Sequence, residues 1–562
     1  MKYFTSADRC ACPAIHRLNS LSTGVLLALL SCAAQAQVFP PAAPLQGGRE
    51  PANPPARSSS SVVPRPAATP AQAVGSAAIE IRKVEFVGNS LFTSEQLAAL
   101  IALKAGASYS LSDFRAWTDR ISDHYHKAGF PFASAFLPQQ KIEAGVLKVE
   151  VIEGRYGQVT SAGQFLPEEA APFFENLKPG QLIGAQLLER TMLILDDLPM
   201  IDVSPLIKPG KAYGTGDLVV DITRLAASGG EAGIDNLGSR YTGQYRARLN
   251  HNLYSKWRMG DEVRLKLLAS DKDLLLGSAD YEMPLNGQGL RWQVGIARTS
   301  YQLAGEYAPL NAFGLAQVFS TRIGYPWERT QARNISVSLG LTSKRLKDEV
   351  GLTSTVNRKS TTAVPLTVVF DRRDAFLGGG LFYGNLVWTA GQLSLDSGLR
   401  QVDSLSARSE GQFQKLAFEV SRIQTLPMNF SLMARYTTQQ ASKNLDSSEK
   451  FSLGGIYGVR AYPSGQGVGD KGWLTQIELR QKIGDVTGFV FYDQGGVTAN
   501  IDPWSSASAT KEKVSGSGLG IRKELPKGWN WELLLAFRHS SDLPSDNSSK
   551  GARALGSVTY RY

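Results

Sequence analysis

The feature that most constrains the fold is an alternation of apolar and polar residues at a period of two, which runs from Arg224 to the last residue. In the segment 529–538 every odd-numbered position is large and apolar, whereas Asn530, Glu532 and Arg538 occupy even-numbered positions. The segments 245–250, 263–267, 335–339 and 477–480 show the same alternation. Successive side chains of a β-strand point to opposite faces, so the pattern predicts strands with one apolar and one polar face.

Such strands build either a soluble β-sandwich or a transmembrane β-barrel. A sandwich would normally divide a segment of this length into separate domains, and the sequence shows no such boundary after residue 225. Aromatic residues gather at the ends of the runs, as expected for interfacial girdles, at Tyr241, Tyr245, Tyr254, Trp257, Tyr301, Tyr325, Trp327, Trp473, Trp529 and Trp531. We therefore predict that residues 226–562 form an all-β transmembrane barrel of about 16 antiparallel strands around a water-filled lumen.

The N-terminal residues 1–36 are predicted to be an export signal. Lys2, Arg9 and Arg17 precede or flank an apolar run at 18–30, and Ala34-Gln35-Ala36 provides a small-x-small cleavage pattern. A lipoprotein box ending at Cys32 is the alternative, although Leu30 is bulkier than that site prefers. All three cysteines, Cys10, Cys12 and Cys32, lie in this segment, which excludes disulfides, thiolate metal sites and a cysteine nucleophile from the mature chain.

Residues 37–78 are rich in proline and alanine and are predicted to be a semi-rigid tether. Two α+β units follow, at 79–154 and 155–225. In the first we expect a strand at 79–86, a helix from Thr93 to Leu103, a second helix opened by a capping box at 110–113, and strands at 133–137 and 146–152. In the second we expect strands at 158–161, 201–207 and 217–223 and helices at 167–177 and 185–195. Two copies of one unit indicate a modular arm whose strand edges could accept an extended peptide.

A glycine-rich stretch at 454–472 lies between two strands and presents Arg460 among apolar neighbours. We expect this arginine to fold into the lumen and pair with a carboxylate. The predicted partner is Asp493, which shares strand parity with Phe491 and would point inward if Val490 and Tyr492 face lipid.

Several cations occupy strand positions whose side chains are expected to face the lumen: Arg246, Arg248, Arg264, Lys266, Arg480 and Arg538. They form either a basic lining that favours acidic or unfolded polypeptide or the ordinary charge of a water-filled lumen, and both interpretations stay open. The net charge of +10 is spread along the chain, unlike the clustered basic face of a nucleic-acid binder. The G-x-G-x-x-G spacing at 467–472 lacks a βαβ context, and His124 and His126 do not share a helix face. We expect no enzymatic activity, no metal and no cofactor.

The chain resembles the outer-membrane transporters of two-partner secretion (TpsB type, the FhaC/ShlB/HecB haemolysin secretion and activation proteins), within the BamA-like superfamily, over residues 79–562. Positions that look like the opening of a POTRA domain are Phe86, Gly88, Asn89, Phe92, Thr93 and Leu97, and the segment 199–210 resembles a second POTRA domain. Val459, Arg460, Ala461 and Tyr462 correspond to the V-R-G-Y/F loop motif, with alanine in place of glycine. Phe491, Asp493 and Gly495 correspond to the F-x-D-x-G strand motif.

The resemblance implies a lumen loop at 451–472 whose arginine contacts the strand aspartate. It implies two periplasmic POTRA domains, at 79–154 and 155–225, that bind one large, unfolded or extended partner protein. A monomeric barrel in contact with outer-membrane lipid would secrete that partner, with activation of a haemolysin or adhesin as one outcome. The alternatives are a BamA-like insertase and a porin-like channel. Two POTRA-like units rather than three or five favour secretion, and a porin would lack the arm.

Overall fold

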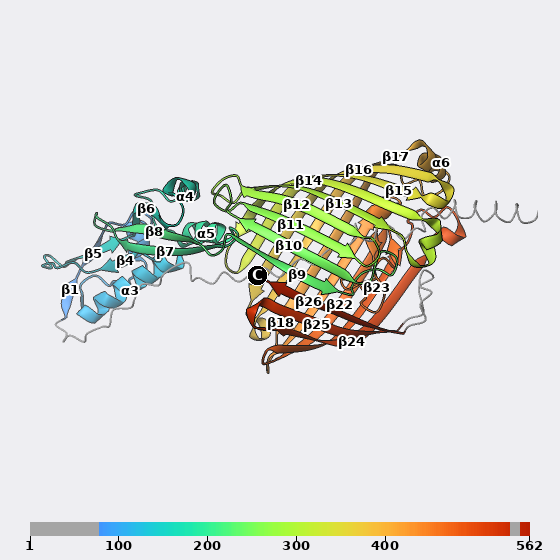
Figure 1. Cartoon of the computed structure of the whole chain (residues 1–562). Coiled ribbons are helices and arrows are strands. Elements are labelled where there is room, and N and C mark those ends of the chain that lie inside the picture. The colour runs from blue at the N-terminus through green and yellow to red at the C-terminus, as the bar shows by residue number, and fades with distance from the viewer. Residues whose placement is uncertain (1–77, 540–550) are drawn as a thin grey trace, which may run out of the picture.

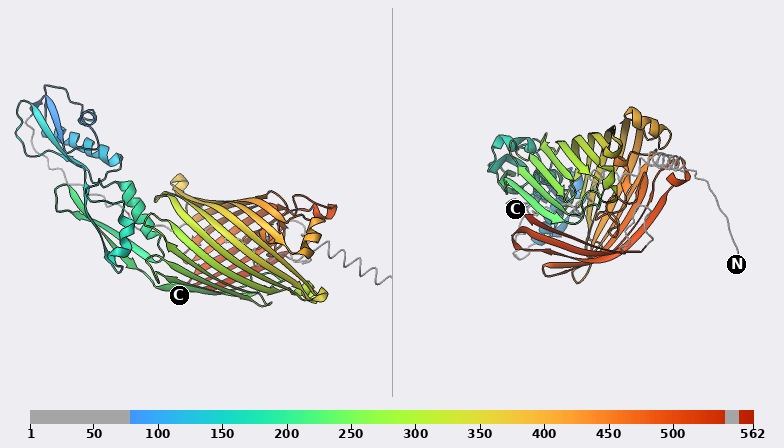
Figure 2. Two further views of the ribbon diagram at one scale, coloured as in Figure 1. Left: turned by 90° about the horizontal axis from the view of Figure 1, so that it is seen from above. Right: turned by 45° about the vertical axis from the view of Figure 1, so that its right-hand side comes forward.

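The structure is a computed structural model that describes residues 78–539 and 551–562. The expected signal segment with Cys10, Cys12 and Cys32, and the expected tether up to residue 77, lie outside the described residues. An α/β arm leads into a wide barrel (Figure 1), and the first unit of the arm lies farther from the barrel than the second (Figure 2). Within the described ranges, no helix has the length and apolar character needed to cross a membrane.

The first unit of the arm packs two helices against a small mixed sheet. Its elements are β1 (Ile79–Ile81), β2 (Lys83–Val87), α2 (Ser94–Ala98), β3 (Ala107–Tyr109), α3 (Leu111–Lys127), β4 (Ser134–Phe136) and β5 (Val146–Ile152). The sheet order is β2-β5-β4, with β2 parallel and β4 antiparallel to β5. The capping box of Ser110 and Asp113 opens α3. Its buried face is formed by apolar residues at three- and four-residue steps, Phe114, Trp117, Ile121 and Tyr125.

Helix α2 is shorter than the sequence suggested. It ends at Ala98 rather than Leu103, because the next turns are held by i to i+3 bonds, such as Leu100 N–H to the Leu97 carbonyl. The chain then reverses at Gly106, at a positive φ of 81°, so that β3 can pair with β1. The pairing of β3 with β1 therefore limits the length of α2.

Glu153 fastens the loop after β2 to the sheet. Its side chain is 2% exposed and accepts hydrogen bonds from the backbone N–H of Ser90 (2.6 Å) and Leu91 (2.7 Å) and from the Tyr125 hydroxyl (3.0 Å). Burial alone would raise the pKa of Glu153, but a hydrogen bond from the Ser90 hydroxyl, together with these donors, outweighs it and holds that pKa below its ordinary value. The charged carboxylate is therefore part of the native structure of this unit.

We expect Glu153→Gln to destabilise the first unit by about 1–3 kcal/mol at neutral pH, because the amide cannot satisfy all of these donors. A carboxyl whose pKa is lowered on folding contributes stability that is present above its ordinary value of 4.5 and is lost as the pH falls through the folded value. The difference between wild type and variant should therefore be full at pH 7 and should shrink below about pH 4.5. Hydrogen-exchange mass spectrometry of residues 79–154 in the intact protein measures this difference in stability. Equal protection of both proteins at pH 7 would contradict the assignment.

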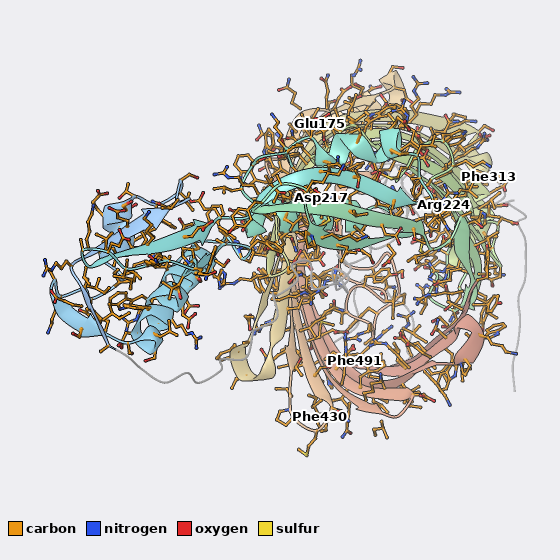
Figure 3. The ribbon with its side chains drawn as sticks, turned by 90° about the vertical axis from the view of Figure 1, so that its left-hand side faces the viewer. Glu175, Asp217, Arg224, Phe313, Phe430 and Phe491 are labelled. Atoms are coloured by element: carbon orange, nitrogen blue, oxygen red, sulfur yellow. The ribbon has the colours of Figure 1, made fainter. Side chains whose placement is uncertain are left out.

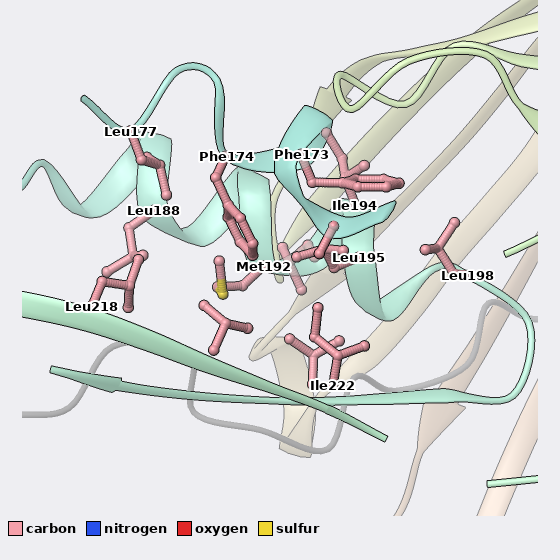
Figure 4. Close-up of a cluster of buried hydrophobic side chains, with 14 of the residues drawn as sticks. Phe173, Phe174, Leu177, Leu188, Met192, Ile194, Leu195, Leu198, Leu218 and Ile222 are labelled. Carbon is pink, nitrogen blue, oxygen red and sulfur yellow. The ribbon is translucent and has the colours of Figure 1, made fainter. Parts of the chain in front are cut away.

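The second unit repeats the design. Its elements are β6 (Arg155–Gly163), α4 (Pro167–Phe174), α5 (Ala185–Asp196), β7 (Ile201–Pro209) and β8 (Thr215–Arg224), with sheet order β6-β8-β7. Phe174, Met192 and Leu195 from the helices pack over Leu218 and Ile222 from β8 (Figure 4). The expected order of elements is confirmed, although β6 is longer than expected and α4 ends before residue 177.

The remainder of the described chain forms a closed antiparallel barrel of 16 strands, as predicted. The strands are β9 (Ser228–Asp235), β10 (Arg246–Tyr254), β11 (Glu262–Ser270), β12 (Leu275–Pro284), β13 (Arg291–Gln302), β14 (Ala312–Arg329), β15 (Arg333–Val350), β16 (Thr355–Asp374), β17 (Gly380–Leu395), β18 (Gly411–Thr425), β19 (Phe430–Ala441), β22 (Lys471–Ile483), β23 (Val486–Thr498), β24 (Lys511–Glu524), β25 (Trp529–Arg538) and β26 (Ala552–Arg561). Strand β26 pairs with β9 and closes the ring. Apolar alternate residues such as Leu265, Leu339 and Leu533 are exposed on the outer face.

Short helices lie in the connections between strands: η1 (Gly305–Leu310), η2 (Gly351–Thr353), η3 (Phe376–Gly378), α6 (Ser397–Ser404), η4 (Ser447–Glu449), η5 (Ser506–Ser508) and η6 (Pro526–Gly528). The expected aromatic girdle is only partly correct. Trp257 and Trp327 are exposed, but Tyr241, Tyr254 and Tyr301 are buried. Tyr241 and Tyr301 belong to a buried cluster with Leu274 and Leu303 at the end of the barrel away from the arm. Their place at the end of an alternating segment was therefore not enough to predict that they face the membrane interface.

The second unit of the arm is fixed to the barrel rim by polar contacts. The Arg329 guanidinium at the end of β14 donates to both carboxylate oxygens of Asp197, at 2.7 and 2.6 Å. Arg190 of α5 donates to the Tyr325 hydroxyl (3.2 Å) and the Pro326 carbonyl (2.7 Å). The arm therefore presents this unit directly at the mouth of the lumen.

Candidate functional site

A long connection between β19 and β22, residues 442–470, folds back against the barrel wall. It begins earlier than the expected loop at 451–472 and contains η4 and a small hairpin of β20 (Phe451–Ser452) and β21 (Val468–Gly469). Val459, Ala461 and Tyr462 at its tip have no exposed surface and pack with residues of β22 to β26. We call residues 442–470 the lumen loop. Figure 3 looks at the barrel from the side of the arm and shows Phe491, which contacts this loop, on the wall away from Asp217 and Arg224.

Arg460 at the tip of the lumen loop makes a two-pronged ion pair with Asp493 of β23. Its Nε and Nη2 donate to the two carboxylate oxygens, both at 2.8 Å, and its backbone N–H donates to Oδ2 at 3.1 Å. The guanidinium also lies over the Phe491 ring, 3.6 Å from its centroid. The side chains of Arg460 and Asp493 are 5% and 0% exposed. The structure thus brings together the arginine and the aspartate that were predicted to pair from their positions in the sequence.

Glu478 of β22 is a second carboxylate on Arg460 that sequence reasoning missed. It accepts from Arg460 Nη1 at 2.5 Å, from Arg480 Nε at 2.7 Å and from Arg522 Nη1 at 2.9 Å. The sequence pattern could have placed Glu478 in the lumen, because Glu478 lies two residues before Arg480 on the same face of β22. In the register it lies opposite Phe491.

Backbone contacts hold the tip from the far side. Arg553 of β26 donates to the carbonyls of Arg460 (3.1 Å) and Tyr462 (2.5 Å), and Arg538 of β25 donates to the Ala461 carbonyl (3.2 Å). The tip is therefore bound by β22, β23, β25 and β26 together.

Two glycines of the wall allow the loop to approach closely. A Cβ on Gly495 would lie 2.5 Å from a methyl of Leu453, and a Cβ on Gly516 would lie 2.6 Å from the Cβ of Ala461. Ala461 is the position at which the motif departs from glycine. Its extra methyl thus fits where β24 has no side chain.

The base of the lumen loop is held by a separate charge cluster on β15, β16 and β18, which the sequence did not indicate. Glu449 pairs with Lys344 of β15 and Lys415 of β18, both at 2.6 Å, and its side chain is 5% exposed. Asp446 pairs with Lys359 of β16 at 2.8 Å. The loop is thus bound to the wall at β15, β16 and β18 as well as at β22 and β23.

The cations of lumen parity do point away from the apolar outer face, but carboxylates accompany most of them. Arg246 pairs with Asp235 (2.8 Å), and Arg248 lies 3.7 Å from the same residue. Arg264 pairs with Glu262 and Glu282, at 2.8 and 3.2 Å, Arg480 pairs with Glu478, and Arg538 contacts the loop. Lys266 is exposed and lies opposite Asn250 and Ser278. The inner wall therefore carries charges of both signs.

Known proteins similar to this chain share both its barrel and its arm. The family described as haemolysin secretion/activation protein ShlB/FhaC/HecB matches residues 214–523, and the family described as POTRA domain, ShlB-type, matches residues 79–154. The heme/hemopexin transporter protein HuxB of Haemophilus influenzae is 24% identical over 472 residues, which are 82% of this chain and 83% of HuxB.

Solved structures show the same fold. CdiB from Escherichia coli superposes with a TM-score of 0.70 at 18% identity, over 88% of this chain and 93% of CdiB. BamA from Haemophilus ducreyi lacking POTRA domains 1–3 superposes with a TM-score of 0.51 at 13% identity, over 86% of this chain and all of that structure (100%).

Proposed function

The chain belongs to the haemolysin secretion/activation family of ShlB, FhaC and HecB, and from this membership we propose that it exports one large partner protein through its barrel under the control of the lumen loop. It is an outer-membrane transporter with its arm in the periplasm. The observation that carries the proposed control is the buried contact of Arg460 with Asp493 and Glu478. A loop bound to two parts of the wall must move before a polypeptide can pass.

The arm is proposed to receive the partner in an unfolded or extended state. Residues 155–225 act as a second POTRA domain beside the first, and edge strands such as β2 and β7 offer unpaired backbone groups to an added strand. Because the second unit is bonded to the rim through Arg329 and Arg190, a bound segment is handed over at the mouth of the lumen. Folding of the partner outside the cell then gives the direction of transport.

The proposal includes no chemical step. Arg460 and Asp493 serve a conformational role, and the protein works as a monomer in outer-membrane lipid, without enzymatic activity and without binding nucleic acid. The inner wall with charges of both signs supports passage of an extended polypeptide of mixed composition rather than selection for acidic chains.

The test of the proposed function is export of a partner in a Gram-negative host. The chain is produced together with a large exoprotein encoded beside it, and the exoprotein is measured in the medium. We expect export to require residues 79–224 and the barrel together, while the levels of other outer-membrane proteins stay unchanged. A general loss of outer-membrane proteins on deletion of the gene would favour an insertase. Conductance that persists without residues 79–224, with no export defect, would favour a porin.

A further inference from the structure

The outer face of the barrel carries a group of cations at the extracellular end of β13, β15 and β16. Arg298 lies opposite Gln317 of β14, which lies opposite Arg345 of β15, and one row farther from the arm Lys347 lies opposite Arg358 of β16. We call Arg298, Arg345, Lys347 and Arg358 the outer basic patch. It is distinct from the lumen loop and from every contact of the transport path described above.

Strand parity places the outer basic patch outside the barrel. The residues next to it in the chain, Lys344 and Lys359, point into the lumen and hold Glu449 and Asp446 of the lumen loop. Neighbouring side chains of a strand point to opposite faces, so Arg345 and Arg358 point outward. Arg298, Arg345 and Arg358 are exposed.

The height of the patch matches the edge of the membrane. Reading β15 from the arm, the outward residues Ile335, Val337, Leu339 and Leu341 are apolar, and Ser343, Arg345 and Lys347 follow them. Arg345 lies ten residues beyond Ile335. At a rise of about 3.4 Å per residue and a tilt of about 40°, this separates them by about 26 Å along the membrane normal, close to the height of about 25 Å of the apolar band of such barrels.

The apolar surface below the patch is continuous across the same strands. Ile296 of β13 is 62% exposed, Phe319 of β14 is 44% exposed and Leu339 of β15 is 56% exposed. A ligand that fits this sector therefore presents anionic groups at the level of the patch and hydrocarbon beneath them.

The charges of the patch are largely unbalanced by the protein. In the part of the chain that the structure describes, the side chains of Arg298, Arg345 and Arg358 form no ion pair, and the Glu349 carboxylate pairs only with Lys347, at 2.7 Å. At the periplasmic end of the same outer face, Arg333 pairs with Glu328 at 2.6 Å. The lumen arginines Arg246 and Arg264 also have carboxylate partners. Arg372, opposite Arg333, is exposed and has no ion pair among the described residues, so unpaired charge also occurs at the periplasmic end. The patch is set apart by having three such arginines close together at the extracellular end.

We propose that the outer basic patch binds the phosphate groups of a phosphorylated glycolipid in the outer leaflet of the outer membrane. Guanidinium groups match phosphate oxygens in a two-pronged geometry, and the lysine adds a point charge. The acyl chains of the same lipid cover Ile296, Phe319 and Leu339, which a free phosphate ion would leave exposed. The long side chains can extend toward the headgroup level from strands that enter the boundary at different heights.

The test measures binding of lipopolysaccharide to the purified full-length protein in detergent micelles. The variant combines Arg345→Gln, Lys347→Gln and Arg358→Gln. The matched control combines Arg333→Gln and Arg372→Gln on the same two strands and the same face, at the periplasmic end. Heat-modifiable migration in electrophoresis shows that each variant retains a folded barrel.

We expect the triple variant to bind lipopolysaccharide about fivefold more weakly for each charge removed, whereas the control changes by less than about twofold. Lipopolysaccharide stripped of its lipid A phosphates should bind wild type at least as weakly as intact lipopolysaccharide binds the triple variant, which retains Arg298. Unchanged affinity in the triple variant, or an equal loss in the control, would overturn the proposal. Inorganic phosphate that competes as well as the lipid would show an ion site only, and polyglutamate that binds the patch while lipopolysaccharide does not would show a polypeptide site; both results would also overturn it.

Discussion

Arg460→Ala is expected to open the channel and to abolish most export while the barrel still assembles. The substitution leaves Asp493 without its main partner and removes one of three arginines from Glu478, both in a buried setting. Removing one member of a buried ion pair costs about 3–5 kcal/mol, because the remaining charge stays desolvated. Displacement of the loop tip returns both carboxylates to water and relieves this cost.

The result is measured as single-channel conductance in planar bilayers and as partner protein in the medium. We expect conductance to rise several-fold, since a cost of about 3 kcal/mol changes the population of the closed loop more than a hundredfold. Export is expected to fall at least about tenfold, because the proposed control requires a loop that closes again on Asp493 and Glu478 and does not stay open. Arg460→Lys keeps the charge but loses the two-pronged contact and should lie between wild type and alanine. The control is Arg322→Ala, a partly exposed arginine near Glu282. Unchanged conductance and export in Arg460→Ala would reject the role of this contact.

Removal of both lysines around Glu449, by Lys344→Ala together with Lys415→Ala, is the second large expected effect. Glu449 would remain buried with neither of its cations, so the base of the lumen loop should leave the wall of β15 and β18. We expect faster hydrogen exchange across residues 442–470 and a conductance above wild type. Because the base and the tip contact different strands, combination with Arg460→Ala should raise conductance beyond either change alone.

A rescue variant separates loss of the ion pairs from general damage. Adding Glu449→Gln to the two lysine substitutions removes the uncompensated charge, so protection of residues 442–470 should return most of the way toward wild type. If exchange is the same in the double variant and in wild type, the cluster does not hold the loop. If the triple variant is no better than the double variant, the effect does not come from the buried charge.

The two sets of contacts support the proposed role of the loop as a gate over that of a fixed plug. Each set consists of desolvated charges whose stability depends on complete pairing, so partial displacement is costly and full displacement into water is much less so. A packed element of this kind tends to have two discrete positions rather than a continuum. A passing polypeptide that takes the space of the tip would favour the second position.

Local sequence patterns were enough to predict most of the elements and the face to which their side chains point. The period-two alternation predicted the barrel and its approximate strand number, because a strand exposed to lipid on one side must present apolar residues at every second position. The spacing of Phe114, Trp117, Ile121 and Tyr125 placed the buried face of α3 for the same local reason. The pairing of Arg460 with Asp493 combined strand parity with the physical demand that a buried arginine find a carboxylate.

Which elements meet inside the barrel could not be predicted from local patterns and became clear from the folded chain. Glu449 contacts Lys344, which is 105 residues away in the sequence, and no local pattern specifies which strands of a closed ring face one another at a given height. The burial of Tyr241 and Tyr301 and the early end of α2 likewise depend on neighbours supplied by other segments. Periodicity assigns each side chain to a face because it is a property of one strand, whereas the partner on that face depends on barrel closure and on the path of the loop.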